Sequence, residues 1–393
     1  MHISIVCDEF PPAPHGGTGS SYRDLAHGLV AAGHKVTVVG VHRRKILDAL
    51  PPDAPAENLR IVRLPCSPPW LRYRLQMLAD RWRLKRWLTR EHQRQPFDII
   101  ECSDYGGWLS SGGSCGTTTI TRMRGSNLFF DHELHRTGDP FEHRLEKKCV
   151  IRATALGAVS QYAARQTLAL CGQPHRPVTV IYNAVDTELF SPSESVATEP
   201  GLIVFVNSLN PKKGIEQLVD AMNTICIKHP SARLAVVGAD TQKTASSGQT
   251  YVEQLRARVR PEFRAQIEFA GRQDRQTGVV NFLRRAHVCC LPSHMETFGI
   301  AAAEAMSVRK PVIYSRTGPG PEVIEDGESG LLCDPADAAD IASKIELLFD
   351  QPQLADRLAH NARRRVLEKF NKADWIPRNV SFFQTAIAES RNQ

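Results

Sequence analysis

The sequence predicts an α/β protein made of two doubly wound domains, each built around a parallel sheet. Three observations lead to this prediction. The chain has 393 residues, which is too long for one hydrophobic core and fits two or three domains. Short strand-like runs alternate with longer helix-like segments. The alternation stops once, in a segment rich in proline, serine and acidic residues, and then starts again.

The first half of the chain is expected to supply the strands of one Rossmann-like domain, residues 1–185. Its strand-like runs cover residues 2–6, 35–40, 60–64, 98–100, 118–123, 156–159 and 178–182. A helix is expected at residues 21–32, because Gly33 provides a C-terminal stop directly after it.

The second half repeats the pattern after the linker-like segment at residues 190–202, and we expect residues 186–370 to form a second Rossmann-like domain. Strands are expected at residues 202–206, 233–237, 266–269, 288–291 and 311–314, and helices at 215–229, 251–258 and 339–349. Ligands of such sheets bind at the carboxyl ends of the strands, so we expect them in a cleft between the two domains.

The composition excludes several classes of protein. Apolar residues make up 42% of the chain and charged residues 23%, which argues against a collagen, a coiled coil or a disordered chain. No apolar run reaches the roughly 18 residues that span a bilayer. The start, MHISIVCDEFPP, predicts a first strand rather than a signal peptide. The ten cysteines form no CxxC pair, so we expect buried thiols in a reducing cytoplasm.

The net charge of +7 is unevenly distributed. Residues 1–185 hold 24 basic and 16 acidic residues, a balance of +8, whereas residues 186–393 hold 25 and 26, a balance of −1. An acidic partner is therefore expected to meet the first half of the chain.

The strongest chemical signal lies at residues 292–306, PSHMETFGIAAAEAM. A strand ends at Leu291, a tight loop follows, and a helix is expected to start near Phe298. Glu296 lies in the loop, and Glu304 lies two turns into the helix. The backbone N–H groups of Phe298, Gly299 and Ile300 are suited to a phosphate. Taken alone, the two glutamates could also be acids at a helix N-terminus that favours negative charge.

This segment resembles the E-x7-E signature of the retaining glycosyltransferases of family 4, which have the two-domain GT-B fold. The resemblance covers nearly the whole chain, and the order and spacing of its motifs make it specific. The further matching motifs are DEFPP (8–12) with GGTG (16–19), IYNAVD (181–186) with FSP (190–192), LNPKKGI (209–215), FAGR (269–272), GPGPE (318–322), DG (326–327) and GLL (330–332).

The resemblance implies roles for particular residues. Glu296 would hold hydroxyls of the donor sugar, Glu304 would hold the ribose of the nucleotide, and Lys213 would pair with the leaving diphosphate. Arg272 is expected among the nucleotide-binding residues. By the same resemblance, residues 371–393 would form a helix that packs back on the first domain.

Two of the expected phosphate-binding features, Lys213 and the glycine-rich turn, are weaker evidence when each is taken alone. Lys213 taken alone could be a solvated turn lysine, but its position before Gly214 and a helix favours a phosphate role. Gly16, Gly17 and Gly19 are expected to precede a helix, where their amides could approach a phosphate or a sugar. A glycine-rich turn is also a common structural connector.

The chain departs from the family pattern at two positions. Ser208 stands where the family usually has an arginine, five residues before the lysine, and this removes a bidentate phosphate clamp. Arg124 stands where the family often has a histidine near the reacting sugar. One hypothesis joins the two departures: Arg124 supplies the positive charge that Ser208 cannot. Arg124 could equally be a structural ion-pair residue.

Residues 70–94, from Trp70 to Arg94, form a basic aromatic segment with eight basic and two acidic residues. A helical wheel gives it two apolar stripes. One holds Leu71, Leu75, Leu78 and Trp82, and the other holds Trp70, Tyr73, Met77, Leu84, Trp87 and Leu88. A second stripe that is rich in tryptophan and flanked by bases suits an anionic membrane surface. A helix packed on both sides and a helical hairpin with solvated basic side chains are the alternatives, and no motif favours nucleic acid.

These observations predict a retaining, metal-independent hexosyltransferase. It would move a sugar from a nucleotide-diphosphate donor, with a UDP-sugar favoured, to a hydroxyl of a glycan, lipid-linked or small-molecule acceptor. No DxD motif or zinc-helix spacing is present, and no cofactor beyond the nucleotide-sugar co-substrate is expected. The expected location is the cytoplasm, with peripheral contact at the inner face of the membrane. The alternatives are a nucleotide-sugar epimerase on the same fold and a catalytically weakened sugar-nucleotide-binding protein.

Overall fold

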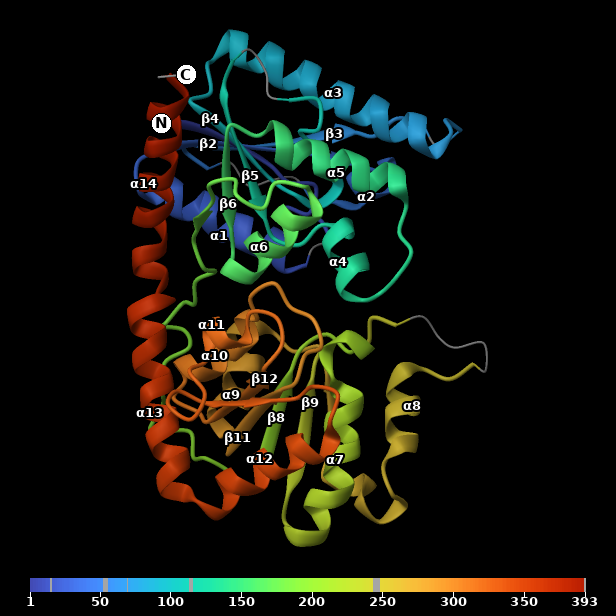
Figure 1. The fold of residues 1–393 in the computed structure, drawn as a ribbon, viewed down its shortest axis with the longest axis vertical. Coiled ribbons are helices and arrows are strands. Elements are labelled where there is room, and N and C mark those ends of the chain that lie inside the picture. Colours follow the sequence, from blue (N-terminus) through green and yellow to red (C-terminus); the bar gives the residue numbers. More distant parts are fainter. Residues whose placement is uncertain (15, 52–55, 69, 113–115, 243–247, 392–393) are drawn as a thin grey trace. The chain divides into compact units, whose positions relative to one another are not determined.

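The computed structural model describes all residues except 15, 52–55, 69, 113–115, 243–247 and 392–393. The chain divides into two units (Figure 1). Unit 1 comprises Met1–Ile181 with Asp374–Gln393, and unit 2 comprises Tyr182–Ala373. The expected domain boundaries, at residues 185 and 371, lie close to these limits.

Unit 1 is built on a seven-stranded parallel sheet with the strand order β3-β2-β1-β4-β5-β6-β7. Its strands are β1 (His2–Val6), β2 (Lys35–His42), β3 (Leu59–Pro65), β4 (Ile99–Ser103), β5 (Thr118–Met123), β6 (Ala155–Ala158) and β7 (Thr179–Val180). Its helices are α1 (Gly17–Ala31), α2 (Arg44–Ala49), α3 (Tyr73–Arg94), η1 (Tyr105–Gly107), α4 (Asn127–Glu133), α5 (Pro140–Arg152) and α6 (Gln161–Leu170). The sheet order reverses between β1 and β4, as in a doubly wound fold.

Unit 2 is built on a six-stranded parallel sheet with the order β10-β9-β8-β11-β12-β13. The strands are β8 (Leu202–Val206), β9 (Arg233–Val237), β10 (Ile267–Gly271), β11 (Val288–Leu291), β12 (Val312–Ser315) and β13 (Leu331–Cys333). The helices are η2 (Pro211–Lys213), α7 (Ile215–Lys228), α8 (Tyr251–Arg258), η3 (Pro261–Gln266), η4 (Arg275–Val279), α9 (Val280–Arg285), α10 (Ile300–Ser307), α11 (Gly320–Val323), α12 (Ala338–Asp350) and α13 (Pro352–Lys369).

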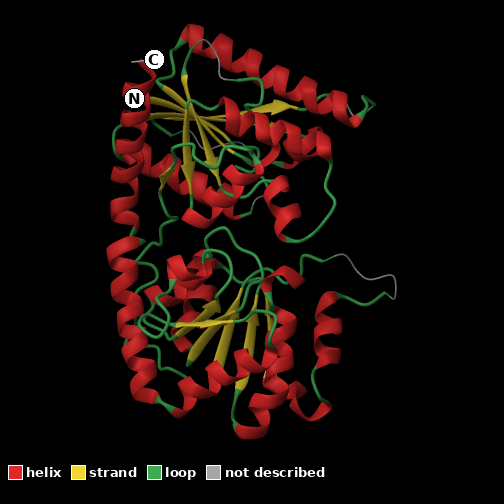
Figure 2. Ribbon diagram, viewed as in Figure 1, coloured by secondary structure: helices red, strands yellow, loops and turns green. Residues whose placement is uncertain are grey.

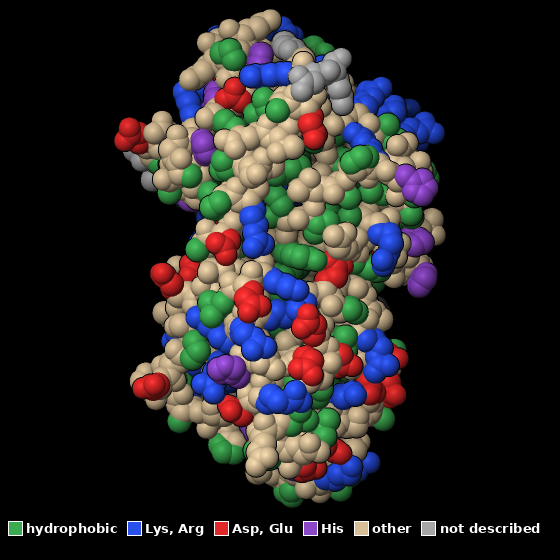
Figure 3. Space-filling view, turned by 60° about the vertical axis from the view of Figure 1, so that its left-hand side comes forward, with side chains coloured by type: hydrophobic (Ala, Val, Ile, Leu, Met, Phe, Trp, Pro, Cys, Tyr) green, Lys and Arg blue, Asp and Glu red, His purple; other side chains and the backbone are tan. Residues whose placement is uncertain are grey.

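The prediction of two doubly wound parallel-sheet units is confirmed. Within each unit, helices cover the sheet, as the secondary-structure colouring makes clear (Figure 2). The central strands are buried along their whole length, because a parallel sheet covered on both faces leaves its apolar runs no contact with water. Acidic and basic side chains intermingle over the face of unit 2 drawn in Figure 3, in keeping with the near-zero charge of the second half.

The C-terminal helix α14 (Lys372–Arg391) belongs to unit 1 from Asp374 onward. Its Asn379 accepts a hydrogen bond at 2.8 Å from Arg122 Nη2, and Arg122 also forms a bidentate ion pair with Glu101. These three side chains are at most 1% exposed. A buried guanidinium needs all of these acceptors, so the network fixes α14 on the sheet of unit 1.

Two local expectations are corrected by the structure. Helix α1 begins at Gly17 rather than at residue 21, so Gly17 and Gly19 lie in the first turn of the helix and do not precede it. The short strand β13 was not expected, since three residues give too little pattern to be recognised.

The cysteines carry free thiols at the nine positions within the described residues, and all of these except Cys66 are buried. Cys115 lies outside the described residues. In the part of the chain that the structure describes, no helix is both long enough and apolar enough to cross a bilayer.

Candidate active site

The candidate site lies in unit 2, where the strand order reverses between β8 and β11. Residues 207–214 follow β8, and residues 292–299 follow β11. Because these parallel strands are neighbours, both loops leave from the same edge of the sheet. The carboxyl edge at such a reversal is the usual ligand site of an open α/β sheet.

The two loops are held together at Gly214. This glycine has φ +67°, and a Cβ atom built on it would lie 1.8 Å from the carbonyl oxygen of Pro292. Only glycine allows this approach. The neighbouring backbone N–H of His294 donates to the carbonyl oxygen of Lys212 at 2.9 Å. The lysine turn and the glutamate loop therefore form one local structure.

Lys213 and Glu296 meet across this junction. Lys213 Nζ lies 2.5 Å from Glu296 Oε1, and the two side chains are 11% and 17% exposed. Asn207 Nδ2 and Ser293 Oγ also donate to the same carboxylate oxygen, each at 3.4 Å. The structure thus brings together two residues that the sequence predicted for the site. It adds Asn207 and Ser293, which the sequence analysis did not assign.

The N-terminus of α10 begins directly after this loop. Phe298 is buried, and its ring packs against Tyr182 and Phe370 at centroid distances of 5.9 and 5.3 Å. Gly299, the N-cap, has φ +89°, and a Cβ atom there would lie 1.8 Å from Tyr314 Oη. The helix begins at Ile300, close to the expected start. Its first-turn N–H groups have no intrahelical acceptors and carry partial positive charge.

Glu304 lies within α10 and is only 4% exposed. Arg275, at the start of η4, holds its carboxylate: Arg275 Nε donates to Glu304 Oε1 at 2.9 Å, and Nη2 donates to the same oxygen. The guanidinium also lies over the ring of Phe190 at 5.3 Å. Sequence reasoning missed Arg275, because nothing near it in the sequence links it to a glutamate 29 positions later.

The remaining predicted residues of unit 2 have different environments. Ser208 is half-buried, and its Oγ accepts a hydrogen bond from Asn210 Nδ2 at 3.0 Å. Its own N–H donates to Asn207 Oδ1 at 3.0 Å. Arg272 is exposed just after β10. Ser208 therefore belongs to the loop that carries Lys213, whereas Arg272 follows a strand farther along the sheet.

The predicted residues of unit 1 lie at the carboxyl ends of its strands. Gly16 is the N-cap of α1, and its N–H donates to Glu9 Oε2 at 3.3 Å. Arg124 follows β5 and is 5% exposed, with its guanidinium 4.6 Å from the ring of Tyr22. Its Nη1 donates to Ser21 Oγ at 2.9 Å. Arg124 is therefore held firmly by the first turns of α1.

Two carboxyl groups with raised pKa values follow the strands at which the sheet of unit 1 reverses. Burial raises the pKa of Asp8, after β1, to about 6 and the pKa of Asp104, after β4, to about 7. Asp104 Oδ1 accepts a hydrogen bond from the N–H of Arg124 at 2.9 Å. Both carboxyls thus titrate nearer to neutral pH than an exposed aspartate does.

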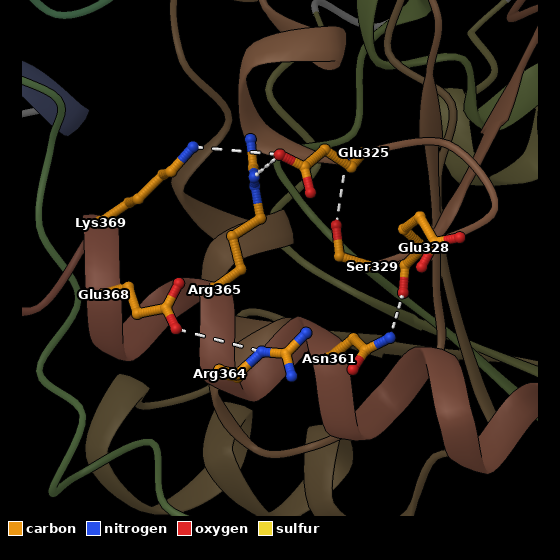
Figure 4. A pocket seen from close by; sticks show the side chains of 8 residues that line it. All are labelled: Glu325, Glu328, Ser329, Asn361, Arg364, Arg365, Glu368 and Lys369. Carbon is orange, nitrogen blue, oxygen red and sulfur yellow. Dashed lines mark hydrogen bonds and ion pairs between the residues drawn. The ribbon is translucent and has the colours of Figure 1, made fainter.

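A separate hollow in unit 2 lies between residues 325–329 and helix α13 (Figure 4). Its charged side chains pair with one another: Arg365 Nη1 lies 2.5 Å from Glu325 Oε1, and Arg364 faces Glu368. No residue predicted for the active site lines it.

Comparisons with known proteins agree with this architecture. A family model described as Glycosyltransferase Family 4 matches residues 15–189, and one described as Glycosyl transferases group 1 matches residues 186–365. The chain is 26% identical to a glycogen synthase of Mycobacterium tuberculosis, over 100% of this chain and 96% of that protein. It is also 26% identical to an uncharacterized glycosyltransferase of Methanocaldococcus jannaschii, over 98% and 99% of the two chains.

Solved structures show the same fold. A sucrose-phosphate synthase from Thermosynechococcus elongatus matches with a TM-score of 0.82 and 22% identity, over 99% of each chain. The Anabaena protein HepE, solved in complex with UDP-glucose, matches with a TM-score of 0.75 and 18% identity, over 98% of this chain and 100% of that one. The two family models divide the chain near the boundary between units 1 and 2. These comparisons show that the protein belongs to glycosyltransferase family 4 and has the two-domain GT-B fold.

Proposed function

We propose that the protein is a retaining hexosyltransferase that uses a nucleotide-diphosphate sugar, with a UDP-sugar favoured. The acceptor would be a hydroxyl of a glycan, a lipid-linked molecule or a small molecule. One observation carries the proposal: Lys213, Glu296 and the N-terminus of α10 lie on two adjoining loops at the sheet reversal of unit 2. HepE, which shares the fold, was solved with UDP-glucose, and this supports the class of donor.

Lys213 and the α10 N-terminus would stabilise the leaving diphosphate. When the glycosidic bond to the diphosphate breaks, negative charge grows on the leaving oxygen. A fixed ammonium and oriented backbone N–H groups lower this barrier, because they need no reorganisation during the reaction. Glu296 keeps the Lys213 ammonium in place at 2.5 Å. Under this proposal, these groups do the work that a metal ion does in other transferases.

The two glutamates would hold different parts of the donor. Glu296 would accept hydrogen bonds from sugar hydroxyls, and the donors Asn207 and Ser293 orient its carboxylate. Glu304 would accept hydrogen bonds from the ribose hydroxyls. The Arg275 guanidinium donates to this buried carboxylate and fixes its orientation.

Retention would follow from a front-face displacement. The bond between the anomeric carbon and the phosphate oxygen breaks, and the acceptor oxygen bonds to the same face of that carbon. The acceptor's proton passes to the leaving phosphate, so atoms and charge balance without a protein nucleophile. Unit 1, with the basic first half of the chain, would bind the acceptor. The reaction would take place in the cytoplasm.

A thermal-shift screen tests the nucleotide class. UDP, GDP, ADP and their sugars are added to the full chain, because a ligand that binds only the folded state raises Tm by mass action. We expect UDP and a UDP-sugar to raise Tm, and the Glu304→Gln variant to lose most of that shift. Glu328→Gln is the matched control, since its side chain is 67% exposed on the surface of unit 2. If no nucleotide raises the Tm of the wild type, the proposal fails.

A product assay distinguishes the reaction class. With an acceptor present, a transferase releases the nucleoside diphosphate and forms a glycoside with retained configuration. An epimerase converts the donor alone to an isomer. Formation of the isomer without any acceptor would overturn the proposed transfer.

A further inference from the structure

Helix α3 exposes an apolar stripe that no other part of unit 1 covers within the described residues. Trp70, just before the helix, is 80% exposed, and Leu75, Leu78 and Trp82 are 51%, 46% and 59% exposed. The last three follow a spacing of three and four residues, so they lie on one side of the helix. Tyr73 adds a further half-exposed aromatic ring. We call these five side chains the α3 stripe. They are five of the nine large hydrophobic side chains that are exposed in the described parts of the chain.

The opposite side of α3 packs against the hydrophobic core of unit 1. This corrects the prediction that the tryptophan-rich stripe faces a membrane. Leu84 and Leu88 are at most 1% exposed and pack with Val39 and Val41 of β2, and Trp87 lies against the same cluster. The stripe that contains these residues was the one expected to face a membrane. Only its later members pack on the core, whereas Trp70 and Tyr73 are exposed. The α3 stripe therefore combines these two rings with Leu75, Leu78 and Trp82 of the other predicted stripe.

The charges that face outward along α3 are positive. Its two acidic residues are buried and engaged: Asp80 Oδ1 accepts a hydrogen bond from the Ser67 N–H at 2.6 Å, and Glu91 pairs with Arg60. Arg72, Arg86 and Arg90 are exposed. The Arg86 guanidinium lies 5.1 Å from the ring of Trp82, next to the stripe.

Two acidic side chains contact the start of α3. Helix α5 adjoins the start of α3 (Figure 1), where Asp139 lies 3.4 Å from Arg74 and Glu142 binds the Tyr73 hydroxyl. Farther along the helix, Arg86 and Arg90 are exposed, and Arg86 lies beside Trp82 of the stripe. A protein partner would need an acidic apolar surface of matching shape, whereas an anionic bilayer offers phosphates beside a hydrocarbon interior along the whole helix.

We propose that the α3 stripe and its flanking arginines bind the surface of an anionic phospholipid bilayer. Tryptophan and tyrosine suit the interface because they combine an apolar ring with a polar group. Arginine forms bidentate hydrogen bonds with lipid phosphates. The helix lies on the membrane and does not cross it. Binding needs neither the donor nor catalysis, so this inference stands apart from the proposed function.

The test is co-sedimentation of the full chain with vesicles of phosphatidylcholine alone or mixed with phosphatidylglycerol. We expect binding to the mixed vesicles to exceed binding to neutral ones by about tenfold or more, and to weaken steeply with added salt. The variant Leu75→Gln/Leu78→Gln/Trp82→Gln should lose about tenfold or more in partitioning, because it removes the side chains that enter the interface. The variant Arg72→Gln/Arg86→Gln/Arg90→Gln should lose the preference for anionic lipid.

The matched control is Ile227→Gln/Leu367→Gln, which changes two other exposed apolar residues, at 57% and 40% exposure. It should bind as the wild type does. Because every substituted side chain is substantially exposed, Tm should stay unchanged in all variants, and this is checked first. The proposal is overturned if the wild type does not bind mixed vesicles, or if the α3 variants bind them as strongly. It is also overturned if light scattering without lipid shows a dimer that the same substitutions dissociate.

Discussion

Replacing Lys213 by methionine tests the centre of the site, because it removes the ammonium and keeps most of the side-chain volume. Lys213 Nζ lies 2.5 Å from Glu296 Oε1, and both side chains are largely buried. Loss of one preorganised charge donor at a developing oxyanion costs about 10²–10³ in kcat, or about 3–4 kcal/mol. The free energy of unfolding should also fall, by about 1.5–3 kcal/mol, since a charge-assisted hydrogen bond is lost.

The assay measures nucleotide release at saturating donor and acceptor, together with urea unfolding of each variant. Lys213→Arg keeps a positive charge and should retain more activity than Lys213→Met. In the double variant with Glu296→Gln, part of the lost stability should return, because no carboxylate is then left without its cation. If the kcat of Lys213→Met lies within about tenfold of the wild-type value, Lys213 does not stabilise the leaving diphosphate. If its effect on stability simply adds to that of Glu296→Gln, the ion pair does not hold the ammonium in place.

Three further changes test separate parts of the structure. Gly214→Ala places a Cβ atom 1.8 Å from the Pro292 carbonyl oxygen, so Tm should fall by several degrees and the donor-induced Tm shift should vanish in a thermal melt. Arg275→Met removes the guanidinium that pairs with Glu304, a side chain only 4% exposed. Nucleotide affinity, measured by calorimetry, should then fall about tenfold or more, and Arg275→Lys should restore part of that affinity. Burial raises the pKa of Asp104 from 3.8 to about 7, so folding stability should decline as pH rises through this range, by at most about 4 kcal/mol. Asp104→Asn should remove that decline in urea unfolding at pH values below and above this range, and an unchanged pH profile would contradict it.

The strands were predictable because their signal is local. The strands at residues 2–6, 118–123, 202–206, 233–237 and 288–291 begin and end where the sequence placed them. Most are short, mainly apolar runs, and burial on both faces of a parallel sheet favours such runs. Residues 118–123, TTITRM, are instead rich in β-branched side chains, which favour strands. The helix α1 was harder to place, because its first turn contains two glycines, Gly17 and Gly19, whose low helix propensity favours a later start.

The contacts within the site were less predictable, because they join distant positions. Motif order placed Lys213 and Glu296 on neighbouring loops, but their pairing across 83 positions depends on the close approach at Gly214. Arg275 carries no motif, and only the packing of η4 beside α10 reveals its role. For α3, the helical wheel gave two apolar stripes. The choice between them depends on the shape of the sheet beneath Leu84 and Leu88, and a wheel does not contain this information.

For Arg124, a loss of activity on substitution does not by itself separate a catalytic role from a structural one, because the side chain is buried. Its guanidinium lies over Tyr22 and donates to Ser21, so Arg124→Ala would leave a cavity beneath α1 and lower stability whether or not the charge takes part in catalysis. Arg124→Lys keeps the charge but loses the planar stacking. If the charge serves the leaving group, the lysine variant should keep most of its kcat at a temperature well below its Tm, while the alanine variant loses it. If the role is structural, both variants should lower Tm and keep kcat, and Ser208 would then stand without a substitute for the clamp that the family usually has.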